Sequence, residues 1–311
     1  MRRQLSQDRF LILSDGKPGH FNQAIAFVRH LGGEYDIQPV AFRSRVAKVF
    51  SYLADRIGYY TSALYHMADV PSHYRAVVSA GSGTYYANRT LARRLGCKSV
   101  AIMLPQGYRL DGFDFIVAQE HDDPPRRENI LTLPINLSYI EPQGLVTPKL
   151  GSRYLALVIG GDSAQGTLDV SLLRSQIERI LSLLPDHRVW LTTSRRTSPA
   201  IETMLREFPS ERAIFYSVEP INPIPDFLNY SDYVFITADS SSMISEAVSY
   251  GSSCVEVLPL SRNASVQRKF GKLLDALQRN DCLHLFAGEL GQANGKISVS
   301  ELLTAATQGK I

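Results

Sequence analysis

Short apolar runs typical of β-strands alternate along this chain with segments typical of helices, and this alternation starts twice. Regular alternation of this kind predicts a parallel sheet covered by helices on both faces. In the first half, strands are expected at residues 10–13, 76–80, 99–103 and 113–118, with amphipathic or helical segments at 21–31 and 91–95. In the second half, strands are expected at residues 154–159, 189–193, 214–216, 233–237 and 254–258, with helices at 170–184, 199–208, 224–230 and 243–250. The sequence therefore predicts an α/β protein with two doubly wound units.

A segment of low periodicity separates the two halves. Residues 138–152, SYIEPQGLVTPKLGS, contain two prolines and two glycines, a composition typical of a linker. We therefore expect one domain at residues 1–145 and a second at residues 146–311. The two halves show no convincing sequence repeat.

Composition and charge limit the classes of protein to consider. With 311 residues, 44% hydrophobic and 20% charged, the chain is expected to form globular domains with apolar cores, not a disordered or fibrous protein. The formal net charge of +3 is too small to indicate nucleic acid. Cys97, Cys254 and Cys282 lie far apart without a CxxC motif, so neither a disulfide framework nor a zinc site is predicted, and a reducing cytoplasm is expected.

No apolar run approaches the roughly 18 residues that span a bilayer. The run at residues 10–13 has four residues and leads into a polar turn, so we expect a first strand there and not a signal peptide. Any contact with a membrane is then expected to be peripheral.

The turns that follow strands are the candidate binding sites, because ligands of doubly wound sheets bind at the carboxyl ends of strands, near helix N-termini that favour anions. The first such turn is SDGKPGH, residues 14–20. Gly16 and Gly19 permit positive φ or the close approach of a ligand, and Lys17 and His20 bring a cation and a proton-transferring group. A plain βα turn, with Asp15 capping the helix and His20 bonded to a backbone carbonyl, explains the same residues equally well.

Two further turns belong to the first half. The turn at residues 80–84, AGSGT, is either a binding loop, through Gly81 and Ser82, or a turn in which Thr84 caps a helix. The turn EHDD at residues 120–123 has the composition of a metal site, but no second His-rich element supports one. We expect Glu120 and His121 to lie on a turn that faces a cleft, and no metal is predicted.

Three turns of the second half suit a phosphate. Paired glycines, Gly160 and Gly161, permit close approach to an anion, and Ser163 nearby can donate a hydrogen bond. The turn TTSRRT at residues 192–197 can clamp a pyrophosphate, because guanidinium groups bind phosphate bidentately, although a solvated pair of arginines is equally common. The turn at residues 237–247 places three serines at a helix N-terminus. Its candidate residues are Asp239, Ser240, Ser241, Ser242, Met243 and Glu246.

These motifs, taken in order, resemble a known family. DGKPGH, GFDFIVAQEHDDP, LVIGGDS, TTSRRTSP and ITADSSSMISEAVSYG are similar to the "elongated mitochondria" family of mitochondrial-fission factors and its bacterial members, over nearly the whole chain. More distantly, the Gly16–Gly19–His20 loop and the helix with Glu246 resemble the peptidoglycan N-acetylglucosaminyltransferase that makes lipid II. The resemblance implies a GT-B architecture, in which two Rossmann-like domains face an interdomain cleft, the first for an acceptor and the second for a nucleotide-sugar.

The resemblance also implies roles for the candidate residues. His20 is the expected base or orienting group, with Asp15 as the second candidate, and the leaving nucleoside diphosphate is stabilised by helix N-termini and an arginine instead of a metal. The implied donor-binding residues are Gly16, Lys17, Gly19, Gly160, Gly161, Ser163, Ser194, Arg195, Arg196, Asp239, Ser240, Ser241, Ser242, Met243 and Glu246. The implied acceptor-side residues are Gly81, Ser82, Glu120 and His121. No cofactor is expected, because the nucleotide-sugar is a substrate.

The chain also departs from the family's pattern. Residues 219–223, EPINP, stand where relatives often carry a Glu-Asn-Pro-Tyr run, and Ser252-Ser253 replace the usual Lys-Pro pair. The identity of the nucleotide and sugar is therefore not implied.

A basic and aromatic segment, residues 43–65, suggests a membrane contact. It interleaves four basic residues with apolar ones, as in helices that bind an anionic membrane surface, although an apolar face packed on the sheet explains the pattern equally well. We expect a metal-independent glycosyltransferase, peripheral on the inner face of the inner membrane, with a bacterial envelope glycolipid such as the lipopolysaccharide core as acceptor. A nucleotide-sugar epimerase and a non-catalytic membrane adaptor are the alternatives.

Overall fold

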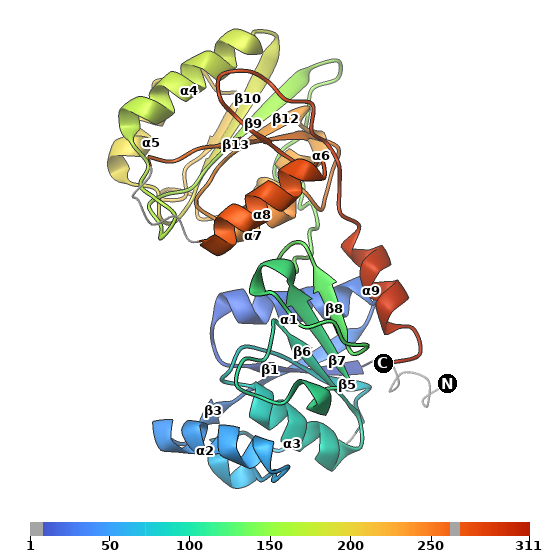
Figure 1. The fold of residues 1–311 in the computed structure, drawn as a ribbon. Coiled ribbons are helices and arrows are strands. Elements are labelled where there is room, and N and C mark those ends of the chain that lie inside the picture. Colours follow the sequence, from blue (N-terminus) through green and yellow to red (C-terminus); the bar gives the residue numbers. More distant parts are fainter. Residues whose placement is uncertain (1–8, 72, 262–267) are drawn as a thin grey trace. The chain divides into compact units, whose positions relative to one another are not determined.

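The chain forms two compact units in a computed structural model that describes residues 9–71, 73–261 and 268–311 (Figure 1). The first unit comprises Met1–Tyr139 and Val299–Ile311, and the second comprises Ile140–Ser298. Each unit has its own sheet and its own apolar core. The α/β class and the doubly wound units predicted from the sequence are confirmed.

The first unit contains a six-stranded parallel sheet. Its strands, in spatial order, are β2 (Glu34–Pro39), β1 (Arg9–Ser14), β5 (Ala76–Ala80), β6 (Lys98–Ile102), β7 (Phe115–Gln119) and β8 (Ile130–Leu133). A short antiparallel pair, β3 (Ala41–Phe42) and β4 (Tyr65–His66), is separate from this sheet. The helical elements are α1 (Pro18–His30), α2 (Arg45–Arg56), α3 (Tyr85–Leu95) and α9 (Val299–Thr307), with 3-10 turns η1 (Ser62–Leu64), η2 (Leu110–Gly112) and η3 (Glu120–Asp122).

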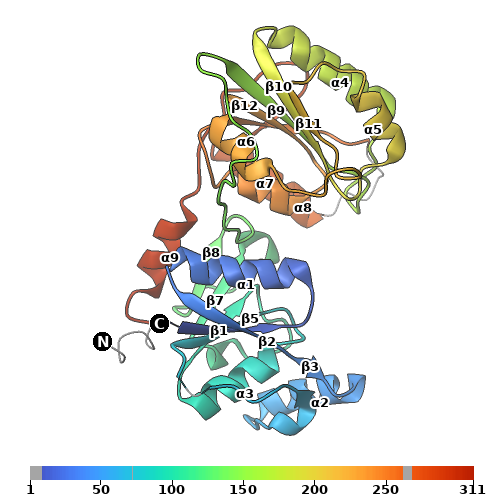
Figure 2. The ribbon, with the colours of Figure 1, turned by 180° about the vertical axis from the view of Figure 1, so that it is seen from behind.

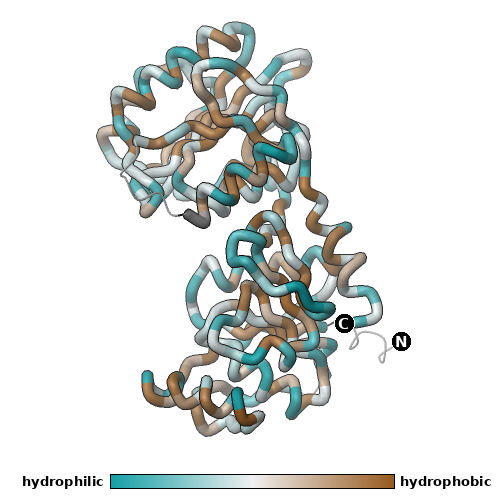
Figure 3. Tube along the Cα trace, in the orientation of Figure 1, coloured by the Kyte–Doolittle hydropathy of each residue, from teal (hydrophilic) through white to brown (hydrophobic). Residues whose placement is uncertain are grey.

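Helices cover both faces of this sheet, α1 on one side and α3 on the other (Figures 1 and 2). Successive side chains of a strand point to opposite faces. Accordingly, Phe10 of β1 meets Phe27 of α1 edge to face at 6.4 Å, whereas Leu11 joins the core beneath α3. Figure 3 shows the hydrophobic colouring of these central strands.

The second unit repeats the architecture with another six-stranded parallel sheet. Its strands, in spatial order, are β11 (Arg212–Ile214), β10 (His187–Thr193), β9 (Arg153–Ile159), β12 (Tyr233–Thr237), β13 (Cys254–Leu258) and β14 (His284–Leu285). One face is covered by α4 (Val170–Leu183) and α5 (Pro199–Leu205), and the other by α6 (Ile224–Tyr230), α7 (Ser241–Ala247) and α8 (Arg268–Arg279) (Figure 2).

The predicted domain boundary needs a correction. The division falls at residue 139 instead of 145, and residues 299–311, assigned to the second domain from the sequence, belong to the first unit. Residues 299–311 belong to the first unit because they form hydrogen bonds with the rest of that unit. His30 at the end of α1 holds Ser300 through Nδ1 at 2.7 Å and the Ser138 carbonyl through Nε2 at 2.7 Å. Lys310 Nζ donates to the Glu128 carbonyl at 2.6 Å.

The segment at residues 43–65 also differs from the expectation. It is one helix only over Arg45–Arg56, and η1 and β4 follow it. None of the helices in the described residues is long and apolar enough to cross a bilayer.

The strand orders define where each unit is expected to bind a ligand. Counted along the chain, the second sheet has the order 3-2-1-4-5-6 and the first has the order 2-1-3-4-5-6. In doubly wound sheets the ligand crevice lies at the carboxyl ends of the two strands where the order reverses. These are β9 and β12 in the second unit, and β1 and β5 in the first.

Candidate functional site

In the second unit, a chain of hydrogen bonds joins the loops at the point of reversal. Gly160 N, just after β9, donates to Thr237 Oγ1 at 2.7 Å, and Thr237 Oγ1 at the end of β12 donates to Asp239 Oδ1 at 2.7 Å. The loop after β10 joins them, because Thr197 Oγ1 donates to the Gly160 carbonyl at 2.5 Å and accepts from Ser194 N at 2.8 Å. Three predicted loops therefore form one cluster. Thr197 and Thr237 were not among the candidate residues, although the turns at residues 192–197 and 237–247 contain them.

A buried carboxylate lies at the centre of this cluster. The Asp239 side chain is inaccessible to solvent and accepts a hydrogen bond from the Arg196 guanidinium. Burial raises the pKa of Asp239, while the hydroxyl of Thr237, the charge of Arg196 and the backbone N–H of Gly161 act in the opposite direction. Asp239 therefore positions Arg196 and is not itself open to a ligand.

The paired glycines are required by this packing. A Cβ on Gly160 would lie 1.9 Å from Asp239 Oδ1, and a Cβ on Gly161 would lie 2.0 Å from the carbonyl oxygen of Arg196. The sequence predicted that these glycines admit a phosphate. In the structure, the space beside these glycines is filled by the loops after β12 and β10.

Replacing Gly161 with alanine is expected to destabilise the protein by about 1–3 kcal/mol, the usual cost of an overpacked site. The added methyl meets a backbone carbonyl, which cannot rotate away as a side chain does. Chemical denaturation measures the loss. The matched control is Gly271→Ala in α8, where no atom lies within 4 Å of the added Cβ. A Gly161→Ala protein as stable as the control would show that the loops after β9 and β10 are not packed this closely.

The remaining donor-side residues divide into those used by the fold and those open to a ligand. Ser163 Oγ accepts from Gln165 N at 3.0 Å, and Ser240 Oγ caps α7 by accepting from Met243 N at 3.4 Å. Arg195 and Ser242 are exposed, and Arg195 forms no ion pair with any described residue. Helix capping thus explains one serine of the three, Ser240.

Glu246 differs from the other acids of the second unit. It lies on α7, partly exposed, and its carboxylate accepts no hydrogen bond from the described part of the chain. Burial raises the pKa of Glu246 to about 7. A partly exposed carboxylate that accepts no hydrogen bond from the protein is open to the hydroxyl groups of a ligand.

In the first unit, the point of reversal brings together an aspartate and a histidine. His20 Nδ1 lies 3.1 Å from Asp15 Oδ2, and a Cβ on Gly81, in the turn after β5, would lie 2.3 Å from the imidazole. Asp15 Oδ1 also accepts from Lys17 N at 3.3 Å, but it does not cap α1, and His20 faces this carboxylate instead of a backbone carbonyl. A carboxylate beside Nδ1 favours the tautomer with the proton on that nitrogen, which leaves the lone pair of Nε2 free.

The two glycines of the first turn have different roles. Gly16 has φ +79°, a conformation that favours glycine. Gly19 lies in the first turn of α1, and a Cβ there would meet no atom within 4 Å. The fold therefore explains Gly16 but not Gly19.

The acceptor-side candidates lie in two places. Gly81 and Ser82 are at the point of reversal, and Ser82 Oγ accepts from Lys48 Nζ of α2 at 2.9 Å. Glu120 and His121 lie in η3, which follows β7. Strand β6 lies between β7 and β5, so η3 is not at the point of reversal. Within the described residues, no group of three His, Cys, Asp or Glu side chains is placed to hold a metal ion.

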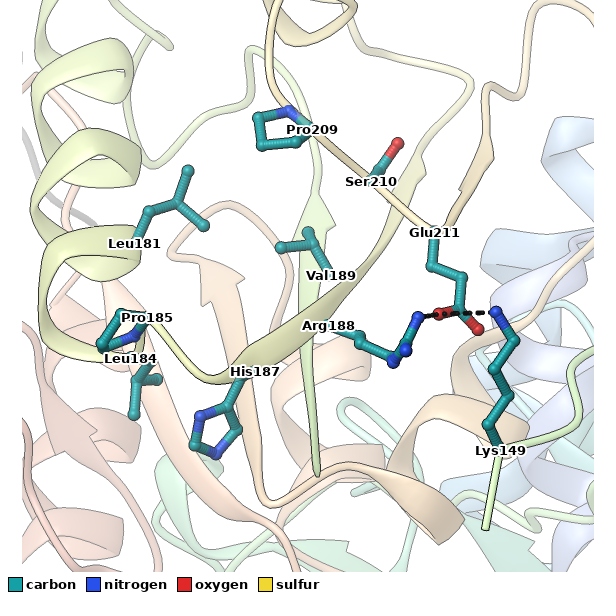
Figure 4. Close-up of a pocket in the computed structure, with 10 residues that line it drawn as sticks. All are labelled: Lys149, Leu181, Leu184, Pro185, His187, Arg188, Val189, Pro209, Ser210 and Glu211. Atoms are coloured by element: carbon teal, nitrogen blue, oxygen red, sulfur yellow. Dashed lines mark hydrogen bonds and ion pairs between the residues drawn. The ribbon is translucent and has the colours of Figure 1, made fainter. Parts of the chain in front are cut away.

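A cavity of about 400 Å³ lies where β10 begins, at the opposite end of the strands from the loops of the candidate site (Figure 4). Its polar wall holds Lys149 and Arg188, and both pair with Glu211, at 3.3 and 2.5 Å. Both cations are already engaged by Glu211, and the cavity lies away from the loops that follow the strands, which carry the predicted site residues.

Two doubly wound units, each with polar loops where its strand order reverses, define a two-domain α/β protein. The chain belongs to the mitochondrial fission ELM1 family, whose sequence model matches residues 18–308. The resemblance seen in the motifs is thereby confirmed.

Several solved structures are similar to this chain at low sequence identity. The glycosyltransferase SnogD from Streptomyces nogalater has 14% identity and a TM-score of 0.48, with 97% of this chain and 94% of that chain covered. MurG from Acinetobacter baumannii has 12% identity and a TM-score of 0.47 at the same coverage. MnaA of S. aureus with UDP has 10% identity and a TM-score of 0.46, with 94% of both chains covered. A comparison with curated proteins gives no significant match.

Proposed function

We propose that this protein is a metal-independent glycosyltransferase that moves a sugar from a nucleotide-sugar to a bacterial envelope glycolipid, such as the lipopolysaccharide core, at the inner face of the inner membrane. The observation that supports this most is the position of the polar clusters. Each unit has a polar cluster at the carboxyl ends of the two strands where the order reverses. That is the ligand crevice of a doubly wound sheet.

The second unit is the proposed donor site. Arg195, exposed and without an ion pair to any described residue, and Arg196, held by Asp239, neutralise the diphosphate of the nucleotide-sugar. Glu246 accepts hydrogen bonds from the ribose hydroxyls. Gly160 and Gly161 contribute by allowing the three loops to converge.

The first unit supplies the proposed base. His20 Nε2 takes the proton of an acceptor hydroxyl as the oxygen forms a bond with the anomeric carbon. The bond between that carbon and the diphosphate oxygen breaks, and the nucleoside diphosphate leaves with the electron pair. Asp15 stabilises the imidazolium formed in this step, since its carboxylate lies 3.1 Å from Nδ1.

A thermal-shift screen with UDP-, GDP-, ADP- and CMP-linked sugars tests the donor site. We expect one of them to raise the Tm of the wild type, since a ligand that binds only the folded state stabilises it by mass action. Glu246→Gln is expected to lose most of this rise, whereas Glu289→Gln, at another glutamate of the second unit, is expected to keep it. If no nucleotide-sugar raises the Tm of the folded wild type, the membrane adaptor becomes the better explanation.

The pH dependence gives a second readout of Glu246. Because the pKa of Glu246 is about 7 in place of 4.5, and ribose hydroxyls bind the ionised form, the ligand-induced rise in Tm is expected to grow between pH 6 and pH 8. Without ligand, the contribution of Glu246 to stability changes with pH in the opposite direction. The ionised carboxylate is less favourable in the folded chain, so stability falls as pH rises from about 4.5 through 7. Glu246→Gln is expected to remove both trends.

A further inference from the structure

Helix α2 presents its apolar side chains to solvent. Five apolar residues recur at helical spacing and are between 48% and 80% exposed. They are Val46, Val49, Phe50 and Leu53 of α2, and Ile57 directly after the helix. The side of α2 that faces the protein carries Ser51 and Asp55, both fully buried. This arrangement is the reverse of an ordinary surface helix. The alternative in which the apolar face of the segment packs on the sheet is therefore wrong. Figure 3 shows hydrophobic residues on α2.

Buried polar contacts hold α2 in this orientation. Asp55 forms an ion pair with Arg89 of α3, which is also buried, and accepts from Arg109 N at 2.7 Å and from the Tyr60 hydroxyl at 2.9 Å. Ser51 Oγ lies 3.0 Å from the Tyr108 hydroxyl. Rotating the helix to bury its apolar side chains would move Asp55 away from Arg89. Arg89 would then lie unpaired against a nonpolar surface. The outward face is thus fixed by the interior of the unit.

The exposed charges of the segment that carries α2, residues 43–65, are of one sign. Arg43, Arg45 and Arg56 are exposed, and the one acidic residue between positions 43 and 65 is the buried Asp55. An apolar stripe bordered by cations is complementary to an anionic lipid surface, where the side chains enter the boundary between headgroups and acyl chains. A second copy of the same face would bring like charges together.

We propose that the outward face of α2 docks this protein on an anionic lipid bilayer, with the helix axis parallel to the membrane surface. The docking face is defined as Val46, Val49, Phe50, Leu53 and Ile57, with Arg43, Arg45 and Arg56 at its border.

The docking face is close to the histidine of the first unit. Lys48 of α2 donates to Ser82, and the neighbouring Gly81 lies against the His20 imidazole. A helix is only about 10 Å across. This step rests on the proposed function: a membrane bound to α2 would present the polar headgroup of a glycolipid acceptor within reach of the base.

Sedimentation with vesicles tests the docking face. The full chain is incubated with phosphatidylglycerol–phosphatidylcholine vesicles and with pure phosphatidylcholine vesicles. We expect binding to the anionic vesicles that weakens as salt is added. The triple variant Val49→Gln, Phe50→Gln, Leu53→Gln should lose it, and Arg43→Gln, Arg45→Gln, Arg56→Gln should weaken it on the order of a hundredfold at low salt. Val218→Gln, at an exposed valine of the second unit, is the control.

Three results would overturn the proposal. These are no binding to anionic vesicles, equal binding by the apolar triple variant, or a dimer in solution that this variant converts to a monomer, which would assign the face to a second copy. The nucleotide-induced rise in Tm is measured on the same proteins. If that rise persists in a protein that does not bind vesicles, docking fails while the donor site stands.

Discussion

Replacing His20 with glutamine is expected to lower the rate of sugar transfer by about 10²–10⁴-fold, the usual contribution of a general base. Glutamine retains a polar side chain but cannot accept the acceptor's proton. The donor is bound by the second unit in our proposal, so the nucleotide-induced rise in Tm should be unchanged. The measurement is release of the nucleoside diphosphate from the nucleotide-sugar that raises the Tm, with an envelope lipid fraction as acceptor.

Neighbouring variants separate a base from a structural histidine. His66→Gln changes an exposed histidine of β4 in the same unit, and its rate should stay within a few-fold of wild type. Asp15→Asn should lower the rate strongly, because an amide can hold the imidazole in the wrong tautomer. Gly19→Ala is compatible with the fold, so a loss of rate there would indicate that the ligand approaches this turn closely. Full activity in His20→Gln would exclude His20 as the base.

Replacing Arg89 with methionine is expected to lower the free energy of unfolding by about 3–5 kcal/mol. Methionine fills much of the same volume but leaves the carboxylate of Asp55 buried without its cation. Besides the ion pair, the guanidinium packs 4.8 Å from the centre of the Tyr60 ring, and that contact is lost as well. Chemical denaturation provides the measurement.

Two further variants control for this result. Arg109→Met removes an exposed ion pair with Asp111, at 2.7 Å, and should leave the free energy of unfolding close to that of the wild type. The double variant Arg89→Met, Asp55→Leu should recover much of the loss, because replacing both partners of a buried pair removes the unpaired charge. An Arg89→Met protein as stable as Arg109→Met would show that the pair does not hold α2.

Much of the fold could be predicted because the central strands are continuous apolar runs. The expected bounds of β5, α6, β12 and β13 agree with the structure, and β11 and α7 begin two residues earlier than expected. Of the edge strands of the two sheets, β11 was predicted, whereas β2, β8 and β14 were missed. β2, with the sequence EYDIQP, is half exposed and carries polar residues, so nothing local separates it from a loop. α8 and α9 were also missed, and α9 depends on contacts with α1 at the other end of the chain.

The candidate site could be predicted only as a set of loops. The rule that ligands bind after strands led to Gly160, Arg196 and Asp239 without any knowledge of their contacts. Which loops meet depends on strand order, and that is not encoded in any short motif. Asp239 and Gly160 lie 79 positions apart, and only the adjacency of β9 and β12 brings them together. For the same reason, Asp55 was not recognised as the partner of Arg89, which lies on a different helix.

The chain passes from one unit to the other twice, and this has a consequence for biosynthesis. The chain leaves the first unit after Tyr139 and returns at Val299, and His30 bonds to a residue beside each crossing, Ser138 and Ser300. A ribosome delivers the amino-terminal residues first, yet the first unit has all of its chain only when α9 has emerged. The second unit, uninterrupted in sequence, has all of its chain earlier and is in a position to fold first.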